Sequence, residues 1–263
     1  MSTPPSPASP RRVVLVTGAA RRVGRTIALD LAEHGNDVAV HYRGSEADAL
    51  ETVEALRAAG ADAQAFQADL SDEAACRSLV PAVIAQFGRL DAVVNNASTF
   101  EYDAAASFSH AAMEKHWRAN TAPAILLAQA LHTHASNRNA TACVVNIIDQ
   151  KLWNPNPDYF SYTLSKAALQ TATVMLAQAL APVLRVCGVA PGITLLSGPM
   201  SAAEFEQAHQ LTPLQRSSRP DDIAHAVRFL IESPAITGTT LLVDGGQHLA
   251  AQPRDVLYLA KSQ

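Results

Sequence analysis

The residues of this chain that could do chemistry are a tyrosine and a lysine four positions apart, Tyr162 and Lys166, in a stretch expected to be helical. Residues four apart lie on the same face of a helix. Since an ammonium group beside a phenol favours the phenolate, we expect Lys166 to lower the pKa of Tyr162 towards neutrality. Tyr162 could then act as an acid or base at working pH. The spacing alone is weak, because a half-buried tyrosine beside a solvated lysine gives the same pattern.

A carboxyl group lies thirteen residues before this tyrosine, because Asp149 ends an apolar run that we expect to be a strand. The geometry predicted is a carboxyl group at a strand end that faces a phenol on the next helix. A carboxylate accepts hydrogen bonds but donates one only when protonated, and burial would raise its pKa. Asp149 would then help Tyr162 to protonate a ring nitrogen, or accept from a substrate N–H group. Both roles suit a polar nitrogen heterocycle, and the plainer alternative is that Asp149 orients Tyr162 or caps a turn.

Composition and charge argue against nucleic-acid and membrane partners, and the scattered cysteines with one histidine pair, His132 and His134, are too small a set for a zinc site. The 263 residues are 48% hydrophobic and carry a net charge of -4, so a sizeable core is expected without a basic field. Three scattered cysteines favour a reducing compartment over a disulfide framework. No apolar run approaches the ~20 residues needed to cross a bilayer, and the Pro- and Ser-rich residues 1–10 predict a flexible tail rather than a secretion signal. We therefore expect a cytoplasmic protein.

Apolar runs that alternate with helical patterns would position these groups. Strands are expected at 13–17, 37–43, 61–67, 91–97, 140–148, 184–192 and 239–246, and helices at 22–34, 45–59, 72–87, 110–134 and 159–180. This alternation predicts an α/β fold: one doubly wound Rossmann domain, residues 11–263, with a seven-stranded parallel sheet and helices on both faces. The longest irregular piece lies between Gly192 and Pro220. Loops of that length are often lids, so we predict a substrate lid at about 193–219.

The first expected strand runs directly into a turn with two glycines, Thr17-Gly18-Ala19-Ala20-Arg21-Arg22-Val23-Gly24. Gly18 would allow a tight turn, and Gly24 would allow close contact between helix and strand. The free N–H groups of the new helix then form a phosphate site. A full G-x-G-x-x-G is absent, but a strand, glycine turn and helix at the start of an α/β chain favour a dinucleotide.

Charge around the second strand favours NADPH over NADH. That strand ends in His41-Tyr42-Arg43-Gly44-Ser45, without the acidic residue that would bind the ribose 2′-hydroxyl of NAD. Arg43, together with Arg21 and Arg22 of the first turn, would instead pair with a 2′-phosphate. The alternative is that these arginines are solvated surface charge. Asp69-Leu70, after the third strand, could reach the adenine.

From about Val13 to Leu249 the chain resembles a short-chain dehydrogenase/reductase. The resemblance depends on motifs in order: the Thr17–Gly24 turn, Asn95-Asn96-Ala97, Asn120, Tyr162 with Lys166, Pro191-Gly192, and Val243-Asp244-Gly245-Gly246. Arg22 stands where the family usually has its middle glycine, and Asp149 where it has a catalytic serine. Both departures resemble the pteridine reductases and bacterial dihydromonapterin reductases, as do His41-Tyr42-Arg43 and the run Asn96-Ala97-Ser98-Thr99-Phe100, although Gly44 replaces a basic residue of the trypanosomatid enzymes.

The resemblance implies a role for each matching residue. Asp149, Tyr162 and Lys166 would form the catalytic centre, with Lys166 also on the nicotinamide ribose. Asn120 would hold a water molecule that links Lys166 to solvent. Phe100 would sandwich a pterin against the nicotinamide, and Asp149 and Tyr162 would also contact the substrate. The cofactor contacts implied are Thr17, Gly18, Arg21, Arg22, Val23, Gly24, His41, Tyr42, Arg43, Ser45, Asp69, Leu70, Asn96, Ala97, Ser98, Lys166, Pro191, Gly192 and Ile193.

The function expected from residues and resemblance together is an NADPH-dependent reductase of a pterin-like substrate, with the proton supplied by Tyr162. A carbonyl or 3-oxoacyl reductase, with Asp149 in an orienting role, is the alternative enzyme. A non-catalytic NADPH-binding sensor is the alternative of another class. The resemblance also implies a homotetramer, which the apolar surface of the expected helix 159–180 would suit.

Overall fold

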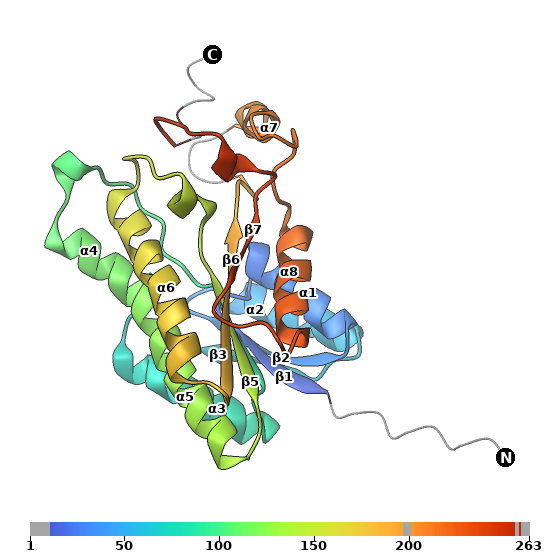
Figure 1. Ribbon diagram of the computed structural model, residues 1–263. Coiled ribbons are helices and arrows are strands. Elements are labelled where there is room, and N and C mark those ends of the chain that lie inside the picture. The colour runs from blue at the N-terminus through green and yellow to red at the C-terminus, as the bar shows by residue number, and fades with distance from the viewer. Residues whose placement is uncertain (1–10, 197–200, 256–257, 259–263) are drawn as a thin grey trace.

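The computed structural model describes residues 11–196, 201–255 and 258, so the tail predicted at 1–10 lies outside the described residues. Seven parallel strands form one sheet in the order β3-β2-β1-β4-β5-β6-β7 (Figure 1). The strands are β1 Arg12–Val16, β2 Asn36–Tyr42, β3 Ala63–Gln67, β4 Ala92–Asn95, β5 Ala142–Ile147, β6 Leu184–Pro191 and β7 Thr240–Val243.

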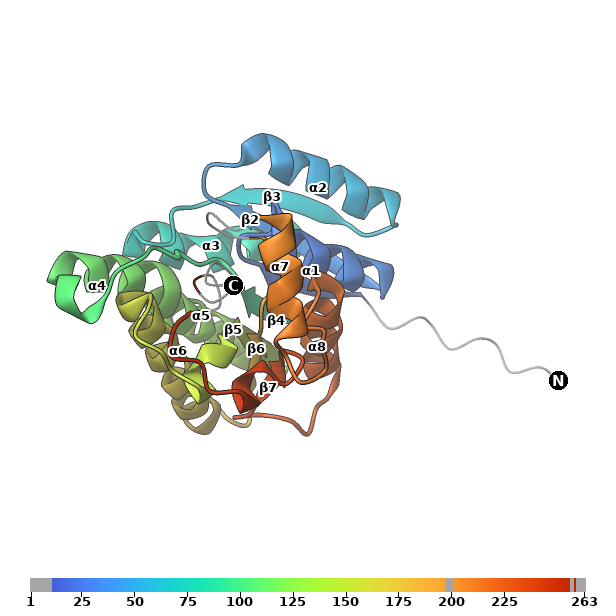
Figure 2. The ribbon, with the colours of Figure 1, turned by 90° about the horizontal axis from the view of Figure 1, so that it is seen from above.

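Helices cover both faces of this sheet (Figure 2). They are α1 Arg22–Glu33, α2 Glu46–Ala58, α3 Glu73–Phe87, α4 His110–His116, α5 Ala122–Asn137, α6 Phe160–Ala179, α7 Ala202–Gln210 and α8 Pro220–Glu232. One apolar core packs α1, α2 and α8 against the sheet, and the other packs α3, α5 and α6 against its opposite face. The fold class predicted from the sequence, a parallel sheet with helices on both faces, is confirmed.

The short β-branched strands are apolar on both sides because both sheet faces are covered. Within β1, Val14 and Val16 enter one core, while Val13 and Leu15 enter the other. Successive side chains of a strand point to opposite faces, which explains this division. A polar exception is Asn95 of β4, which donates to Asn146 of β5 across the ladder at 2.8 Å.

Two expectations about the helices are wrong. The long helix expected at 110–134 is divided by a π-helical turn at Trp117–Thr121, which separates α4 from α5. Pro123 lies in the first turn of α5 and has no N–H to donate, so the hydrogen-bond register shifts and Ala122 N–H reaches the carbonyl of Trp117. The segment expected to be irregular up to Pro220 contains α7, and the sequence analysis placed no helix at 220–232, where α8 lies.

The sheet reverses its direction of growth between β1 and β4, which are neighbours in space but not in sequence. In open parallel sheets, ligands bind outside the carboxyl ends of the strands at this point. The turn after β1, the loop after β4, the start of α6 and the C-terminal segment all lie at this end (Figures 1 and 2). Within the described part of the chain, no helix has the length and apolar character needed to cross a membrane.

Candidate active site

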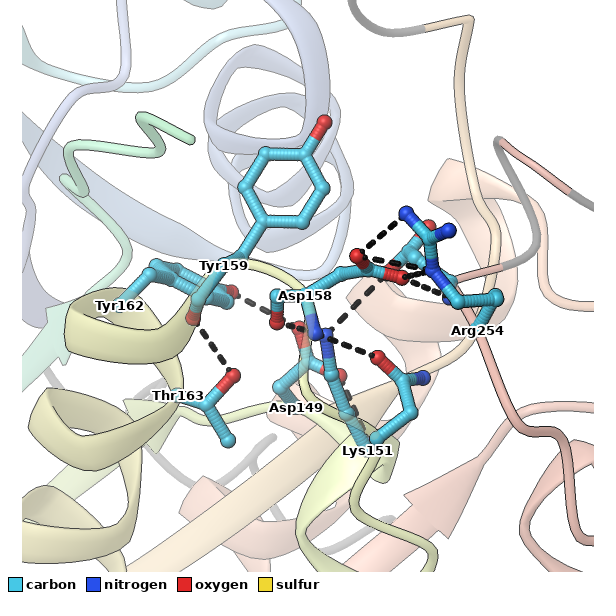
Figure 3. A network of polar contacts seen from close by, with 9 residues as sticks. Asp149, Lys151, Asp158, Tyr159, Tyr162, Thr163 and Arg254 are labelled. Atoms are coloured by element: carbon cyan, nitrogen blue, oxygen red, sulfur yellow. Dashed lines mark hydrogen bonds and ion pairs between the residues drawn. The ribbon is translucent and has the colours of Figure 1, made fainter. Parts of the chain in front are cut away.

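The tyrosine and the aspartate selected from the sequence face each other. Asp149 lies two residues beyond the end of β5, and Tyr162 is in the first turn of α6. The Tyr162 hydroxyl donates to Asp149 Oδ2 at 2.8 Å. The other carboxylate oxygen, Oδ1, accepts from the backbone N–H of Lys151 at 2.8 Å and so caps the short turn Gln150–Trp153. The predicted geometry, a carboxyl group at a strand end facing a phenol on the next helix, is confirmed (Figure 3).

The pKa of Tyr162 is shifted in the direction opposite to the one that we expected. Burial, the charge of Asp149 and the hydrogen bond to it raise the pKa of Tyr162 well above its ordinary value. Our expectation that Lys166 would lower this pKa is therefore wrong for the protein alone, because the phenol is buried and the group that it contacts is a carboxylate. Burial also raises the pKa of Asp149, as we expected, against the opposing effects of its hydrogen bonds and of Lys166. The phenol thus keeps its proton.

Lys166 is directed at the backbone rather than at the phenolic oxygen. Its ammonium donates to the carbonyl of Ile147 at 2.8 Å and lies 5.8 Å from the centre of the Tyr162 ring. Burial lowers the pKa of Lys166 to about 8, and the charge of Asp149 acts in the opposite direction. Lys166 is therefore a buried cation whose charge changes close to neutral pH.

Aromatic rings form one wall beside the pair. The Phe100 ring stacks on that of Tyr159 with centroids 4.1 Å apart, and it lies nearly perpendicular to the Tyr162 ring with centroids 4.7 Å apart. Phe100 comes from the loop after β4, while Tyr159 precedes α6 with a left-handed backbone (φ 53°). Phe100 remains 42% exposed, so it offers an apolar surface to a ligand that enters beside Tyr162.

Asn120 does not have the free side chain that a water relay would use. Its oxygen accepts from the N–H of Thr99 at 2.7 Å and from the hydroxyl of Ser98 at 3.2 Å. Its nitrogen donates to the carbonyl of Thr99 and the hydroxyl of Ser165, both at 3.0 Å. An amide side chain has two donor hydrogens and an oxygen that accepts twice, so all four positions are used. The contacts fix the loop after β4 to α6, and the relay role of this side chain stays a prediction without geometric support.

Two adjoining cavities open at this end of the sheet. The first, of about 350 Å³, we call the tyrosine cleft; it contains Asp149, Tyr162, Lys166, Phe100, Pro191, Gly192 and Ile193. The second, of about 680 Å³, we call the arginine cavity; it contains Gly18, Arg21, Arg22, Val23, Gly24, His41, Tyr42, Arg43, Ser45, Asp69, Leu70, Asn96, Ala97 and Ser98. They share Arg22, Val23, Asn96 and Ser98, so an extended molecule could lie in both.

The glycine turn has the close contacts that a phosphate-binding turn needs. Gly18 has a left-handed backbone (φ 64°), and a Cβ at Gly24 would overlap the Gly18 carbonyl and the side-chain amide of Asn96. Arg22, which stands at the usual middle glycine, is also left-handed (φ 55°). Its guanidinium donates to the carbonyl of Leu196 at 3.0 Å, at the start of the predicted lid. The turn therefore keeps a glycine-like path although an arginine occupies it.

The arginines of the second cavity differ in how they are held. Arg21 donates to the Ser45 hydroxyl at 2.5 Å and lies 3.5 Å from a carboxylate oxygen of Asp48. Arg43 forms no ion pair within 4.0 Å in the part of the chain that the structure describes, although its charge helps to lower the pKa of Asp69 after the hydrogen bonds from Ser71. Arg43 is therefore the guanidinium most available to an anionic group.

The polar groups of several predicted cofactor residues are already hydrogen-bonded within the protein. Thr17 is the predicted cofactor residue that lies in neither cavity. Its buried hydroxyl accepts from the N–H groups of Asn96 (2.9 Å) and Ala97 (3.0 Å). His41 Nδ1 accepts from Gly18 N–H at 3.0 Å and its Nε2 lies 3.1 Å from the Ala68 carbonyl. Burial lowers the pKa of His41 to about 4, so it is neutral and fixes the turn. The N–H of Ile193 donates to Gln247 at 3.2 Å.

Part of the tyrosine cleft was not predicted from the sequence. Lys151, Gln252, Arg254 and Asp255 line it together with the predicted residues. Lys151 lies two positions after Asp149 and could have been noticed as a charged residue beside the carboxylate. The other three follow the last strand, where no pattern in the sequence pointed to the site.

The fold and the two cavities define a Rossmann-type oxidoreductase with a tyrosine, a lysine and an aspartate together in one cleft. The sequence profile of the family described as enoyl-(acyl carrier protein) reductase matches residues 18–248. The chain belongs to the short-chain dehydrogenase/reductase family.

Relatives in this family have more than one activity. The crystal structure of FolM alternative dihydrofolate reductase 1 from Brucella suis in complex with NADP is 39% identical, covers 92% of this chain and 96% of its own, and has a TM-score of 0.88. Pteridine reductase 1 from Leishmania tarentolae is 34% identical over 93% of this chain and 98% of its own length. The 3-oxoacyl-(acyl-carrier-protein) reductase FabG from Staphylococcus aureus is 33% identical over 89% and 97%. These likenesses therefore establish the family of the chain.

Proposed function

We propose that the protein is an NADPH-dependent reductase that converts a 7,8-dihydropterin to the tetrahydropterin. The observation that carries the proposal is the hydrogen bond between Tyr162 and Asp149 at the bottom of a cleft walled by Phe100. A carboxyl group in place of a serine suits a substrate that presents ring nitrogens and amino groups, because it can accept from them or, when protonated, donate to them. The likeness to pteridine reductase 1 and to FolM agrees with this choice.

The cavities fit NADPH. The overlap that a Cβ at Gly24 would cause shows how closely the helix start approaches the turn, and the N-terminus of α1 then faces the place of a pyrophosphate. Arg21 and Arg43 lie in the arginine cavity where a ribose 2′-phosphate would bind, and guanidinium groups pair with phosphate in a bidentate manner. When bound, NADPH would supply the hydride.

The residues of the chain would supply the proton and hold the ring. In the protein alone, Tyr162 keeps its proton because its pKa is raised, which suits a proton donor. Asp149 holds the phenol in place and can bind an amino or N–H group of the substrate. Lys166, a cation at neutral pH because its pKa is about 8, would stabilise the developing phenolate through its charge near the Tyr162 ring. Phe100 would stack on the bicyclic ring and exclude water from it.

The test is oxidation of NADPH by the purified protein, followed by absorbance, with dihydrobiopterin, dihydromonapterin, dihydrofolate and a 3-oxoacyl thioester. We expect turnover with at least one of the three pterin substrates and a lower kcat/KM for the thioester. Absence of turnover with all three pterins, together with reduction of the thioester, would assign the chain to the second candidate. That candidate, a 3-oxoacyl or other carbonyl reductase, is favoured by the likeness to FabG. Tight NADPH binding without any turnover would indicate a sensor.

We also propose that the protein is a cytoplasmic homotetramer. Exposed apolar side chains lie on α6, where Leu164 is 42% and Met175 62% exposed, and on α8, where Phe229 is 50% exposed. Strand β7 forms one edge of the sheet and is only half-buried along its length. Two such faces would give two interfaces. Light scattering coupled to size exclusion should report four copies, and a monomer would contradict the proposal.

A further inference from the structure

The C-terminal segment 250–255 forms part of the tyrosine cleft, and Figure 3 shows its attachment to the loop before α6. Arg254 donates through Nε and Nη2 to both carboxylate oxygens of Asp158, each at 2.8 Å. The N–H of Asp255 donates to the same carboxylate at 2.7 Å. Further along, Asn154 donates to the carbonyl of Ala250 at 2.5 Å. Asp158 is 2% exposed, so this is a built attachment rather than a surface contact.

Lys151 connects this segment to the proposed proton donor. Its backbone N–H donates to Asp149, whereas its ammonium extends the other way, to the carbonyl of Asp158 at 2.5 Å and to Asp255 Oδ2 at 3.4 Å. The residue is 4% exposed. A buried ammonium is unfavourable unless it is paired and hydrogen-bonded. Its ion-pair partner within 4.0 Å in the described part of the chain is Asp255, which comes from a segment 104 residues away.

We propose that Asp255 is a positioning residue: it holds the Lys151 ammonium away from Asp149, so that the Asp149–Tyr162 pair keeps the proton that reduction requires. The C-terminal segment would then both line the tyrosine cleft and influence the protonation of the Asp149–Tyr162 pair. This inference rests on the proposed function for its choice of substrate but not for its geometry. Without Asp255, two carboxylates remain near Lys151: that of Asp158, whose two oxygens already accept from Arg254, and that of Asp149, two residues away on the same turn. An ion pair there would favour the ionised carboxylate.

The charges around the pair act in a consistent direction. The negative charge of Asp255 contributes to raising the pKa of both Asp149 and Tyr162. Removing that charge therefore lowers both pKa values. Because Asp149 and Tyr162 interact, their titrations are coupled, and we expect the apparent pKa values of the pair to change together. The ionisable groups around the pair are Lys166 of α6, Lys151 of the adjoining turn, Asp158 and Tyr159 before α6, Arg254 and Asp255 of the C-terminal segment, and His116 of α4, whose ring lies 6.3 Å from that of Tyr162.

The experiment compares the pH dependence of kcat/KM for the wild type and Asp255→Asn. We expect a decrease of about tenfold above neutral pH, with the alkaline limb of the profile displaced to lower pH by about one unit, because a unit of pKa corresponds to a factor of ten. NADPH affinity should be unchanged. Arg254→Gln, which loosens the same segment but leaves the carboxylate in the chain, should give a smaller displacement in the same direction. Asp62→Asn is the matched control, since Asp62 is exposed and precedes β3 at the opposite end of the sheet.

The decisive variant is the double change Lys151→Met with Asp255→Asn. If Asp255 acts by restraining Lys151, removing the ammonium as well should restore most of the lost activity and return the limb towards its wild-type position. A double variant as impaired as Asp255→Asn, or an Asp255→Asn profile that coincides with the wild type, would overturn the proposal.

A second readout keeps this test separate from the choice of substrate. Ultraviolet difference titration against Tyr162→Phe reports ionisation of the Tyr162 phenol without turnover, and we expect it at lower pH in Asp255→Asn. A wild type that reduces thioesters but no pterin would end the pterin assignment, while this titration would still decide the role of Asp255. An unchanged phenol titration would reject that role even if pterins are reduced.

Discussion

The two cavities at the carboxyl end of the sheet differ in how exposed their ionisable groups are and in whether the pKa values of those groups are displaced. In the tyrosine cleft, Tyr162 and Lys166 are buried and Asp149 is half-buried, all three are hydrogen-bonded, and their pKa values are displaced. In the arginine cavity, Arg21 and Arg43 are exposed cations beside a glycine turn. Proton transfer near neutral pH needs groups whose ordinary pKa values have been shifted, whereas binding of a phosphate needs charges that stay fixed. The difference indicates which cavity does chemistry and which one binds.

The cavities also differ in how the chain builds them. Strands β1, β2 and β3 and the turns that follow them supply most of the arginine cavity, within residues 18–71. The tyrosine cleft combines the end of β5, the start of α6, the loop after β6 and the C-terminal segment. Local sequence therefore specifies the binding cavity, while the cleft depends on contacts between distant segments.

The largest effect is expected from Tyr162→Phe. Loss of the hydroxyl removes the proton donor and its hydrogen bond to Asp149, and general acid catalysis commonly contributes 10²–10⁴-fold. We expect kcat to fall by about a thousandfold, equivalent to about 4 kcal/mol of transition-state stabilisation. The dissociation constant for NADPH should stay within about twofold, because the arginine cavity is unchanged. Tyr102→Phe, at an exposed tyrosine, is the control, and retention of normal turnover by Tyr162→Phe would remove this residue from the mechanism.

The next effect concerns the substrate. Asp149→Ser restores the residue that most family members have, and it removes the carboxyl group proposed to bind a nitrogen heterocycle. We expect kcat/KM for a dihydropterin to fall about a hundredfold, about 2.7 kcal/mol, with an unchanged or improved value for a 3-oxoacyl thioester. The ratio of the two kcat/KM values is the measurement. A thioester activity that falls in parallel with the pterin activity would mean that Asp149 supports Tyr162 in general rather than selecting the substrate.

How far the sequence could predict this structure follows the same division. Hydrophobic periodicity and glycine positions predicted all seven strands and the two-sided cover, because these signals are local. The facing of Asp149 and Tyr162 was also predictable, since one ends a strand and the other begins the next helix. The helix α7 has a capping box, Ser201 with Glu204, that a closer reading of local pattern could have found.

Other features have no local signal. Arg254 and Asp158 are 96 residues apart, and opposite charges at that distance in sequence indicate nothing until the fold brings them together. The direction of the Tyr162 pKa shift was wrong because sequence shows which charges are near in the chain but not how deeply the phenol is buried or which charge it contacts. The hydrogen bonds of the Asn120 side chain had no local signal either, since its four partners come from the loop after β4 and from α6, and its relay role stays a prediction.

The arginine cavity contains a buried histidine, His41, whose titration should appear in stability rather than in catalysis. Its pKa of about 4 lies below the ordinary value of 6.5, so its contribution to stability is present above pH 6.5 and is lost as the pH falls towards 4. Between about pH 7 and pH 5 this linkage amounts to about 2 kcal/mol of the free energy of unfolding.

Urea unfolding at the two pH values measures this contribution. We expect His41→Asn, which can still accept from Gly18, to be less stable than the wild type at neutral pH but to lose less stability on acidification. Gln in place of the exposed His110 serves as the control and should follow the wild-type curve. Parallel losses in wild type and His41→Asn would show that the buried ring does not govern the acid response.

The smallest effect is expected for Arg43→Ala, and it completes the comparison because it should leave chemistry untouched. A charge-assisted hydrogen bond to the 2′-phosphate contributes about 1.5–3 kcal/mol. Because this arginine is exposed, water reduces the net contribution. We therefore expect KM for NADPH to rise about tenfold. The kcat at saturating NADPH and the KM for NADH should not change, since NADH lacks the phosphate. Arg57→Ala on α2 is a matched control, because its guanidinium binds the carbonyl of Ala63 away from both cavities. Equal effects on NADPH and NADH would mean that Arg43 supports the cavity wall rather than recognising the phosphate, and the contrast between a cavity of fixed charges and a cleft of shifted ones would then rest on Arg21 and Arg22.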